Sequence, residues 1–350
     1  MKESNRVFVG CDLGDKFTEI AVLDGAGAVM ETGRIRTTRA ALQKHLGKFQ
    51  GARVVIEVGA HSRWVSELIE SLGHEVVVAN PRQVPLIFGR RQKTDRSDAM
   101  VLARLGRFDV SLLAPVRHRP RATQVDLATI RSRDVLVSAR TKLVNHVRGT
   151  LKQFGLLMKK ASTPTAVIKD ARRVVPPELQ SALGPVLATL ELLDAQIDAH
   201  DTAVEQLAAS YPQVARMTQI HGVGELSALT FALTIADPHR FEKSRFAGAF
   251  FGLTPAKDQS GDSDPQKRIT KAGDPLMRRL LVQCAHHVIG PFAKDSDLRR
   301  WGLRLAARGG KNARKRAVVA VARKLAVLMH RLWLSGEPYQ PLGYATAHAK

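Results

Sequence analysis

The sequence predicts an α/β domain with a mixed β-sheet at its N-terminal end, followed by a long, mostly helical region. Strand-like, β-branched segments fill much of the first 80 residues and alternate with helical patterns. Helical periodicity takes over from about residue 120. Hydrophobic residues make up 44% of the 350 residues and aromatic residues only 5%, which favours a helix-rich globular protein with two or three domains.

The first 80 residues define the elements of the α/β domain. The first strand ends at Asp12-Leu13-Gly14, and the turn from Asp24 to Gly27 joins the next two strands into a hairpin. Thr38 caps the helix that follows. The expected strands are 6–12, 17–23, 28–36, 53–57 and 75–79. The first expected helix is 38–49. A second runs through Trp64, Leu68 and Leu72 and stops at Gly73, and a third starts at Asn80–Pro81. A hairpin followed by alternating strands and helices indicates a mixed sheet.

Four acidic residues occupy special positions in this domain. Asp95 and Asp98 lie one turn apart at the start of an apolar helix, within Lys93-Thr94-Asp95-Arg96-Ser97-Asp98-Ala99. The helix dipole favours acidic residues there, and for this pair alone that explanation suffices. Asp12 and Glu57, however, each end a strand, on the side of an open α/β sheet where ligands bind. Four such carboxylates together favour a Mg²⁺ site, which Mn²⁺ could also fill.

The second acidic position has two competitors, Glu67 and Glu70. Both lie on the amphipathic helix that follows the strand 53–57, and we expect them on its solvent-exposed face. We therefore prefer Glu57 as the metal ligand.

The charge of the chain points to a polyanionic partner. The formal net charge is +22, which favours nucleic acid or an acidic membrane surface. No stretch approaches the length of a membrane span, and the first residues lack the apolar core of a signal sequence. We expect a cytoplasmic, nucleoid-associated protein that binds nucleic acid and not a membrane. Cys11 and Cys284 lie far apart without ligand spacing, so neither a disulfide framework nor a zinc site is indicated.

Two long helices are expected in the middle of the chain. The first, from about 120 to 160, is basic, and the second, from about 178 to 210, is acidic. Pro164 and Pro176–Pro177 interrupt the region between them. Opposite charges would let the two helices pair as a hairpin or coiled coil. A solvated helical bundle and a dimerisation arm with a basic side facing nucleic acid are both compatible with this pattern.

The C-terminal region contains a candidate nucleophile, Ser260. A Gly-x-Gly turn at 220–224 opens an apolar helix, as in helix-hairpin-helix DNA-binding modules, and a polar loop at 257–265 is followed by another helix from Pro275. A turn serine is the ordinary explanation for a serine beside glycine. Neither a serine-hydrolase triad nor Gly-x-Ser-x-Gly is present, so a nucleophilic Ser260 would need a metal or a basic side chain as its partner. Three basic residues nearby could hold phosphate oxygens, namely Lys267, Arg268 and Lys271.

The segment from Leu298 to Gly336 is strongly basic. It contains eleven Lys and Arg residues and no acidic residue. A charge run is often only a solvated surface, but one this one-sided is typical of contact with a phosphate backbone. The expected contacts are Lys311, Arg314, Lys315 and Arg316, just before a helix from Ala317 to Leu334.

Four sequence features together resemble the insertion-sequence 110/1111 family of bacterial transposases. They are the strand ending in Asp12, Ile56-Glu57 with Gly-His-Glu-Val and Asn80-Pro81 downstream, the segment Lys93 to Ala99, and Gly-Leu-Thr-Pro…Gln-Ser-Gly…Ile-Thr-Lys-Ala-Gly. Their order and spacing match from about residue 6 to about 330. Two details differ: Val58-Gly59 stands where the family often has Thr-Gly, and the serine loop carries Asp258, Asp262 and Asp264.

The resemblance implies a ribonuclease-H-like domain of the RuvC, or Holliday-junction-resolvase, type at 1–115, a helical assembly region at 116–212, a transposase domain at 213–336 and a tail at 337–350. It also implies an acidic tetrad of Asp12, Glu57, Asp95 and Asp98, and a catalytic Ser260 that becomes covalently attached to DNA. The acidic site, with Mg²⁺, would lie beside the serine of another protomer in a homo-oligomer, a dimer or a tetramer. A structured guide RNA from the element's non-coding end would bridge donor and target DNA.

These observations favour a DNA recombinase, and three alternatives remain open. A metal-dependent junction nuclease of the same fold would use water in place of Ser260. An actin-like sugar kinase would need a second Asp-x-Gly hairpin and a glycine-rich adenosine segment, and neither is found. A non-catalytic basic protein that binds DNA or RNA would leave the four-acid pattern to coincidence.

Overall fold

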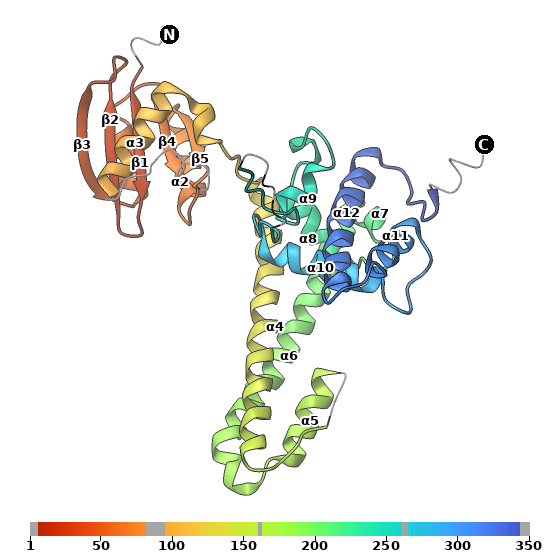
Figure 1. Cartoon of the computed structure of the whole chain (residues 1–350). Coiled ribbons are helices and arrows are strands. Elements are labelled where there is room, and N and C mark those ends of the chain that lie inside the picture. Colours follow the sequence, from red (N-terminus) through yellow and green to blue (C-terminus); the bar gives the residue numbers. More distant parts are fainter. Residues whose placement is uncertain are drawn as a thin grey trace, which may run out of the picture. The chain divides into compact units, whose positions relative to one another are not determined.

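The structure is a computed structural model that describes residues 6–81, 95–159, 163–260, 263, 265 and 267–343 (Figure 1). The chain folds into two compact units, residues 1–118 and 119–350. The helix expected from Asn80–Pro81 falls on residues outside the described ranges, as do Lys93 and Thr94 of the acidic motif. The expected boundaries at 115, 212 and 336 stay predictions.

A mixed five-stranded sheet forms the first unit. Its strands are β1 (Phe8–Leu13), β2 (Phe17–Leu23), β3 (Val29–Arg36), β4 (Arg53–Glu57) and β5 (Glu75–Ala79), in the order β3-β2-β1-β4-β5. β1, β2 and β3 pair antiparallel, whereas β4 runs parallel to both β1 and β5. β2, β4 and β5 have the bounds expected from the sequence. A mixed sheet of this kind fits the ribonuclease-H-like domain that the resemblance implies.

Helices cover both faces of the sheet. One face carries Val9, Cys11 and Ile56, which form a core with α1 (Arg39–Leu46) and α2 (Ser62–Ser71). The other face packs against α3 (Asp95–Phe108), which is followed by the 3-10 turn η3 (Val110–Leu113). Thr38 caps α1 as expected, since its hydroxyl accepts a hydrogen bond from Ala41 N–H.

Gly10 determines how closely α3 approaches β1. A Cβ atom at this position would overlap the backbone of Ala99 and Ala103, so only glycine lets the helix lie against the strand. Because side chains alternate along a strand, residues 8, 10 and 12 of β1 point toward α3. The close approach fixes which part of α3 lies over β1.

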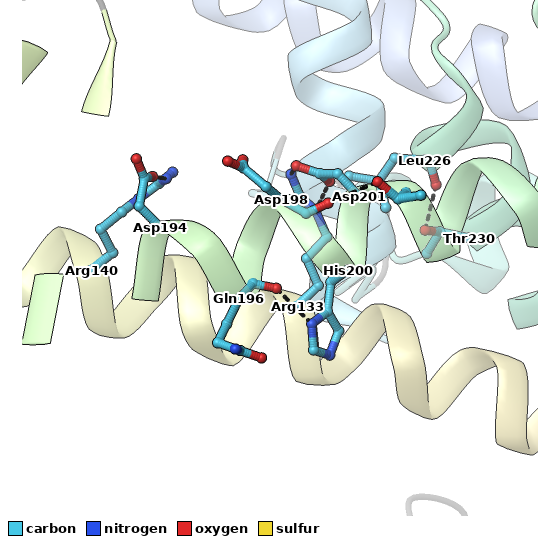
Figure 2. Close-up of polar contacts among 10 residues, drawn as sticks. Arg133, Arg140, Asp194, Gln196, Asp198, His200, Asp201, Leu226 and Thr230 are labelled. Atoms are coloured by element: carbon cyan, nitrogen blue, oxygen red, sulfur yellow. Dashed lines mark hydrogen bonds and ion pairs between the residues drawn. The ribbon is translucent and has the colours of Figure 1, made fainter. Parts of the chain in front are cut away.

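A helical hairpin begins the second unit (Figure 1). α4 (Arg121–Gln153) packs along α6 (Gln180–Ala209), with α5 (Pro164–Val174) and the 3-10 turn η4 (Pro177–Leu179) between them in sequence. Arg133 on α4 pairs with Asp201 on α6, and Arg140 pairs with Asp194, so the two helices run antiparallel (Figure 2). The expected pairing of a basic with an acidic helix is confirmed.

The remaining helices form the C-terminal core. They are α7 (Pro212–Met217), α8 (Glu225–Ile235), the 3-10 turn η5 (Pro238–Arg240), α9 (Phe246–Phe250), α10 (Pro275–Val288), α11 (Asp297–Ala306) and α12 (Ala313–Ser335). Leu127 and Ile130 of α4, and Val204 of α6, belong to the same hydrophobic core. The base of the hairpin is therefore built into the core that carries the serine loop. None of the helices in the described ranges is both long and apolar enough to cross a membrane.

Several helices differ from expectation. Pro164 starts α5 instead of only interrupting the region, because Thr163 caps the helix and proline suits its first turn. α12 starts at Ala313, so Arg314, Lys315 and Arg316 lie inside its first turn and not before it. α7, α9 and α11 were not expected as separate helices.

Candidate catalytic sites

Asp12 and Glu57 lie side by side at the carboxyl ends of neighbouring strands. The last paired residues of β1 and β4 are Cys11 and Ile56, and Asp12 and Glu57 directly follow them. Adjacent strands are about 4.8 Å apart. Both carboxylates are half-buried, and both point to the face that α3 covers.

Asp95 and Asp98 are in the first turn of α3. At the other end of this helix, Arg107 Nε donates to the Gly25 carbonyl (3.1 Å), beside the start of β1. Arg53, the first residue of β4, donates to the carbonyl of Gly106 (3.0 Å). The end of α3 thus lies at the amino ends of the strands, and its first turn lies toward the edge where the strands end.

The four acidic residues therefore share one edge of the sheet. Asp95 is exposed and Asp98 half-buried. Carboxylate oxygens at such an edge are the right donors for a hard divalent cation. In the described ranges, however, no three His, Cys, Asp or Glu side chains come close enough together to hold a metal ion. The backbone arrangement fits a metal site, and the side chains do not converge as ligands.

Three other residues that could in principle bind a metal are less suited to do so. Burial, and secondarily Asp12, raises the pKa of Cys11 to about 12, so this thiol stays protonated and is a poor ligand. Glu67 and Glu70 are on α2, which covers the opposite face of the sheet, and Glu67 pairs with Arg63 (2.9 Å). Their position supports the preference for Glu57.

Sequence reasoning missed a polar group at the same edge. Trp64 Nε1 donates to His61 Nδ1 (3.0 Å), so the neutral ring carries its proton on Nε2, which faces Asp15 Oδ1 at 3.4 Å. Asp15 follows β1 and His61 follows β4. The only sequence signal is that both residues come three or four positions after an acidic strand end.

Ser260 lies on an extended hairpin between α9 and α10. Ala256 N–H donates to the Arg268 carbonyl (2.9 Å), and Thr270 N–H donates to the Thr254 carbonyl (2.9 Å). Near the tip, Ser260 and Ser263 exchange two backbone hydrogen bonds of 3.1 Å. Ser260 is exposed. Gly261, Asp262 and Asp264 lie outside the described residues.

The basic residues near Ser260 are exposed but differ in their partners. Lys267 forms an ion pair with Asp258, which neutralises part of its charge. Arg268 and Lys271 are exposed on the returning side of the hairpin. The expected contacts at the start of α12, Lys311, Arg314, Lys315 and Arg316, are exposed as well.

Comparison with known proteins identifies the family. Residues 9–155 match the family model DEDD_Tnp_IS110, described as "Transposase", and residues 214–300 match the model "Transposase IS116/IS110/IS902 family". A putative transposase of Sinorhizobium fredii, y4qE, is 30% identical over 79% of this chain and 70% of its own length. The chain belongs to the IS110 family of transposases. This confirms the family inferred from the sequence motifs, and it means that the enzyme acts on DNA by phosphoryl transfer.

Other relatives extend the match over nearly the whole transposase. The transposase for insertion sequence element IS1111A of Coxiella burnetii is 28% identical over 95% of this chain and 91% of the relative. The transposase for IS1328 of Yersinia enterocolitica is 29% identical over 80% of this chain and 83% of the relative. The two family models together span Asp12, Glu57, Asp95, Asp98 and Ser260.

Proposed function

We propose that this transposase cuts and joins DNA strands with two groups of residues, the acidic edge of a RuvC-type domain and Ser260. The observation that carries the proposal is the placement of Asp12 and Glu57 on neighbouring strands with the first turn of α3 at the same edge. The order of these residues, Asp, Glu, Asp, Asp, agrees with the DEDD name of the family model that matches this region.

The acidic edge would hold Mg²⁺, or Mn²⁺ in its place. Asp12 and Glu57 would provide oxygen donors from the sheet, and Asp95 and Asp98 would provide them from the first turn of α3. A bound divalent ion would neutralise charge on the phosphodiester oxygens. The carboxylates themselves keep nucleic-acid phosphates away unless such an ion is present, because like charges repel.

Ser260 is proposed as the nucleophile of strand cleavage. Its Oγ loses a proton and forms a bond to phosphorus, while an oxygen of the cut strand leaves and takes up a proton. The phosphoserine bond retains the energy needed to join the next strand. Its exposure and its position on a projecting hairpin support this role, as does the basic pair Arg268 and Lys271 on the returning side.

The partners proposed are DNA, a guide RNA encoded by the element, and further copies of the chain. Arg314, Lys315 and Arg316 lie at the positive end of the α12 dipole, where their charges are unfavourable without an anion and favourable toward a phosphate. Self-association is proposed on the resemblance to the family alone. The acidic edge of one protomer would then act with Ser260 of another.

A second candidate function is a metal-dependent junction nuclease that uses water. The acidic edge lies in the first unit, residues 1–118, which has its own hydrophobic core. Hydrolysis at this edge would need no group from the second unit. In that case Ser260 would be incidental.

A trapping assay separates the two functions. The transposase is incubated with Mg²⁺, end-labelled element-junction DNA and the RNA from the element's end, and the products are run on a denaturing protein gel. The matched control is Ser263→Ala, because Ser263 pairs with Ser260 across the serine loop. Labelled protein that is lost in Ser260→Ala but kept in Ser263→Ala supports the serine mechanism. Cleaved DNA without labelled protein, unchanged by Ser260→Ala, supports the nuclease. DNA left uncut under all conditions contradicts both.

A further inference from the structure

The two ends of the serine loop, residues 253–273, lie against each other. Gly252, just before the loop, has φ +68° and no space for a side chain, because a Cβ atom there would overlap the backbone of Ala272. Lys271 N–H donates to the Gly252 carbonyl (3.1 Å) and closes the loop at its base. The base is therefore a tight junction of two backbone segments.

A single side chain connects both segments. Nη1 of Arg278, on α10, donates to the Phe251 carbonyl (3.1 Å) and to the Ala272 carbonyl (2.8 Å). These two acceptors lie on opposite sides of the loop base. Since hydrogen bonds from a charged donor are stronger than neutral ones, this bridge adds a strong connection to the backbone pairs.

The bridge is not needed to form α10 itself. The side chain of Asp274 caps this helix by accepting the Met277 N–H (2.9 Å), and Pro275 occupies its first turn. Met277 and Leu281 are fully buried and fasten the helix to the core. The two hydrogen bonds of Arg278 are thus directed at the loop ends, while other residues start the helix and anchor it.

We propose that Arg278 is a positioning residue for Ser260, an inference that rests on the proposed nucleophilic role of this serine. The tip of the serine loop is exposed. Ser260 can attack in line only if the loop holds its Oγ in one orientation toward the phosphorus. Fixing both ends through one guanidinium nitrogen limits how far the tip swings. Displacing a reacting group by about 1 Å can reduce a rate by about a hundredfold.

Three variants test the proposal. Arg278→Met keeps an unbranched apolar stem as long as the part of arginine from Cβ to Nε, and it removes both hydrogen bonds. Arg278→Lys keeps a charged nitrogen with three N–H donors, but its Nζ lies one bond short of Nη1, so it should regain only part of the native bridge. Arg173→Met, on the exposed surface of α5, is the control with the same change in charge.

Two measurements are made on the full-length protein. The first is the single-turnover rate of covalent-adduct formation at saturating DNA, together with the DNA concentration for half-saturation. The second is amide hydrogen exchange of Ala256, Thr270 and Lys271, whose N–H groups form the loop pairs. For Arg278→Met we expect a rate about ten- to a hundredfold lower, an unchanged half-saturation and faster exchange in the loop but not in α10. Arg278→Lys should restore part of the rate, and the control should behave as the native protein.

Several results would overturn the proposal. Loop amides that exchange at the native rate in Arg278→Met would show that the bridge does not hold the loop. A rate loss that disappears at higher DNA concentration would make Arg278 a DNA contact instead. If exchange in α10 also rises in Arg278→Met, the Arg278→Lys variant decides. A lysine variant with α10 intact and a rate no higher than that of Arg278→Met counts against the bridge. An adduct that forms equally well with Ser260→Ala would refute the serine mechanism, while the exchange data would still report on the loop.

Discussion

Arg131 on α4 donates to the side chain of Asp274 (3.1 Å), whose other oxygen caps α10. One carboxylate thus joins the helical hairpin to the end of the serine loop. A second ion pair, between Asp134 of α4 and Arg279 of α10, lies beside it. The pKa of Arg119 is lowered, first by burial and then by Arg131 and Arg240, and Asp274 opposes this effect. Asp274 therefore also offsets a local excess of positive charge.

Replacing Asp274 should separate its two roles. Asp274→Asn keeps a capping oxygen and should cost less than about 1 kcal/mol of unfolding free energy, because Arg131 is half-exposed and its pairing is weak. Asp274→Ala also removes the cap and should cost about 1 to 2 kcal/mol. Denaturant titrations in a Trp64→Phe background would follow the second unit through the fluorescence of Trp301 and Trp333. Equal losses in both variants would contradict the capping role.

The Arg140–Asp194 pair should contribute more to the hairpin than an exposed pair does. Its side chains are only 19% and 14% exposed, so Arg140→Met leaves a half-buried carboxylate with the Thr165 hydroxyl at 3.2 Å. We expect a loss of about 2 to 3 kcal/mol, with partial recovery when Asp194→Leu is added. Arg172→Met, in the exposed pair with Glu191, is the control and should change the unfolding midpoint much less. No recovery in the double variant would mean that the pair is not coupled.

Acid should destabilise the second unit through His330. Burial lowers the pKa of this residue, the hydrogen bond to the Pro238 carbonyl opposes the shift, and His239 adds to it. The unfolded state then binds the proton more tightly, so stability is full above about pH 6.5 and falls as the pH drops, by up to about 1.4 kcal/mol per pH unit. Unfolding free energies from pH 7.5 to 5.5 should fall less steeply in His330→Gln. The same flattening in the exposed control His146→Gln would assign the effect elsewhere.

The proposed metal ligands should be needed for cleavage and not for binding. Asp98→Asn should lower single-turnover DNA cleavage in Mg²⁺ at least about a hundredfold, because a neutral amide is a much weaker ligand than a carboxylate. DNA affinity measured in Ca²⁺ should stay within about threefold of the native value. Such a change corresponds to less free energy than one bidentate protein–DNA contact provides. Glu70→Gln, on the opposite face of the sheet, is the control. Normal recombination by Asp98→Asn would remove this residue from the site.

The basic turn of α12 should determine part of the salt dependence of nucleic-acid binding. Changing Arg314, Lys315 and Arg316 to glutamine should reduce the slope of log affinity against log salt by about 2 to 3, if each residue neutralises one phosphate of a duplex. Affinities at four salt concentrations between 50 and 300 mM are sufficient for the measurement. An unchanged slope would exclude phosphate contacts by this turn.

Local sequence signals predicted most of the N-terminal domain. β4 and β5 are short β-branched runs bounded by glycine, turn or polar residues, and their bounds agree with the expectation. The placement of β4 beside β1 depends on crossover packing, which no single segment encodes. The acidic positions could be named from the same local signals, because strand ends and first helical turns are recognisable. Whether these residues bind metal stays a prediction.

Two of the helices that were missed, α5 and α11, had recognisable starting signals. In Thr163-Pro164, a capping residue is followed by a proline in the first turn of α5. From the sequence alone, this proline is interpreted only as an interruption of the helical region. α11 begins after Ser296, a capping serine, inside a run considered only for its charge.

Arg278 could not have been found from sequence. Its acceptors are the backbone carbonyls of Phe251 and Ala272, and a backbone carbonyl leaves no trace in residue identity. Only the folded loop shows that these carbonyls lie within reach of one side chain.

In the hairpin of α4 and α6, the Arg–Asp ion pairs between the helices are spaced seven residues apart on each helix. This spacing would allow the hairpin to be shortened or lengthened by whole seven-residue units. Arg133 and Arg140 are seven residues apart on α4, and their partners Asp201 and Asp194 are seven apart on α6. Seven residues complete about two helical turns and advance about 10 Å. Deleting seven residues from each helix would keep the facing side chains in register, whereas deleting one residue would rotate the rest of the helix by about 100°. The tip of the hairpin can therefore be moved toward or away from the C-terminal core in steps of about 10 Å while its orientation is largely kept.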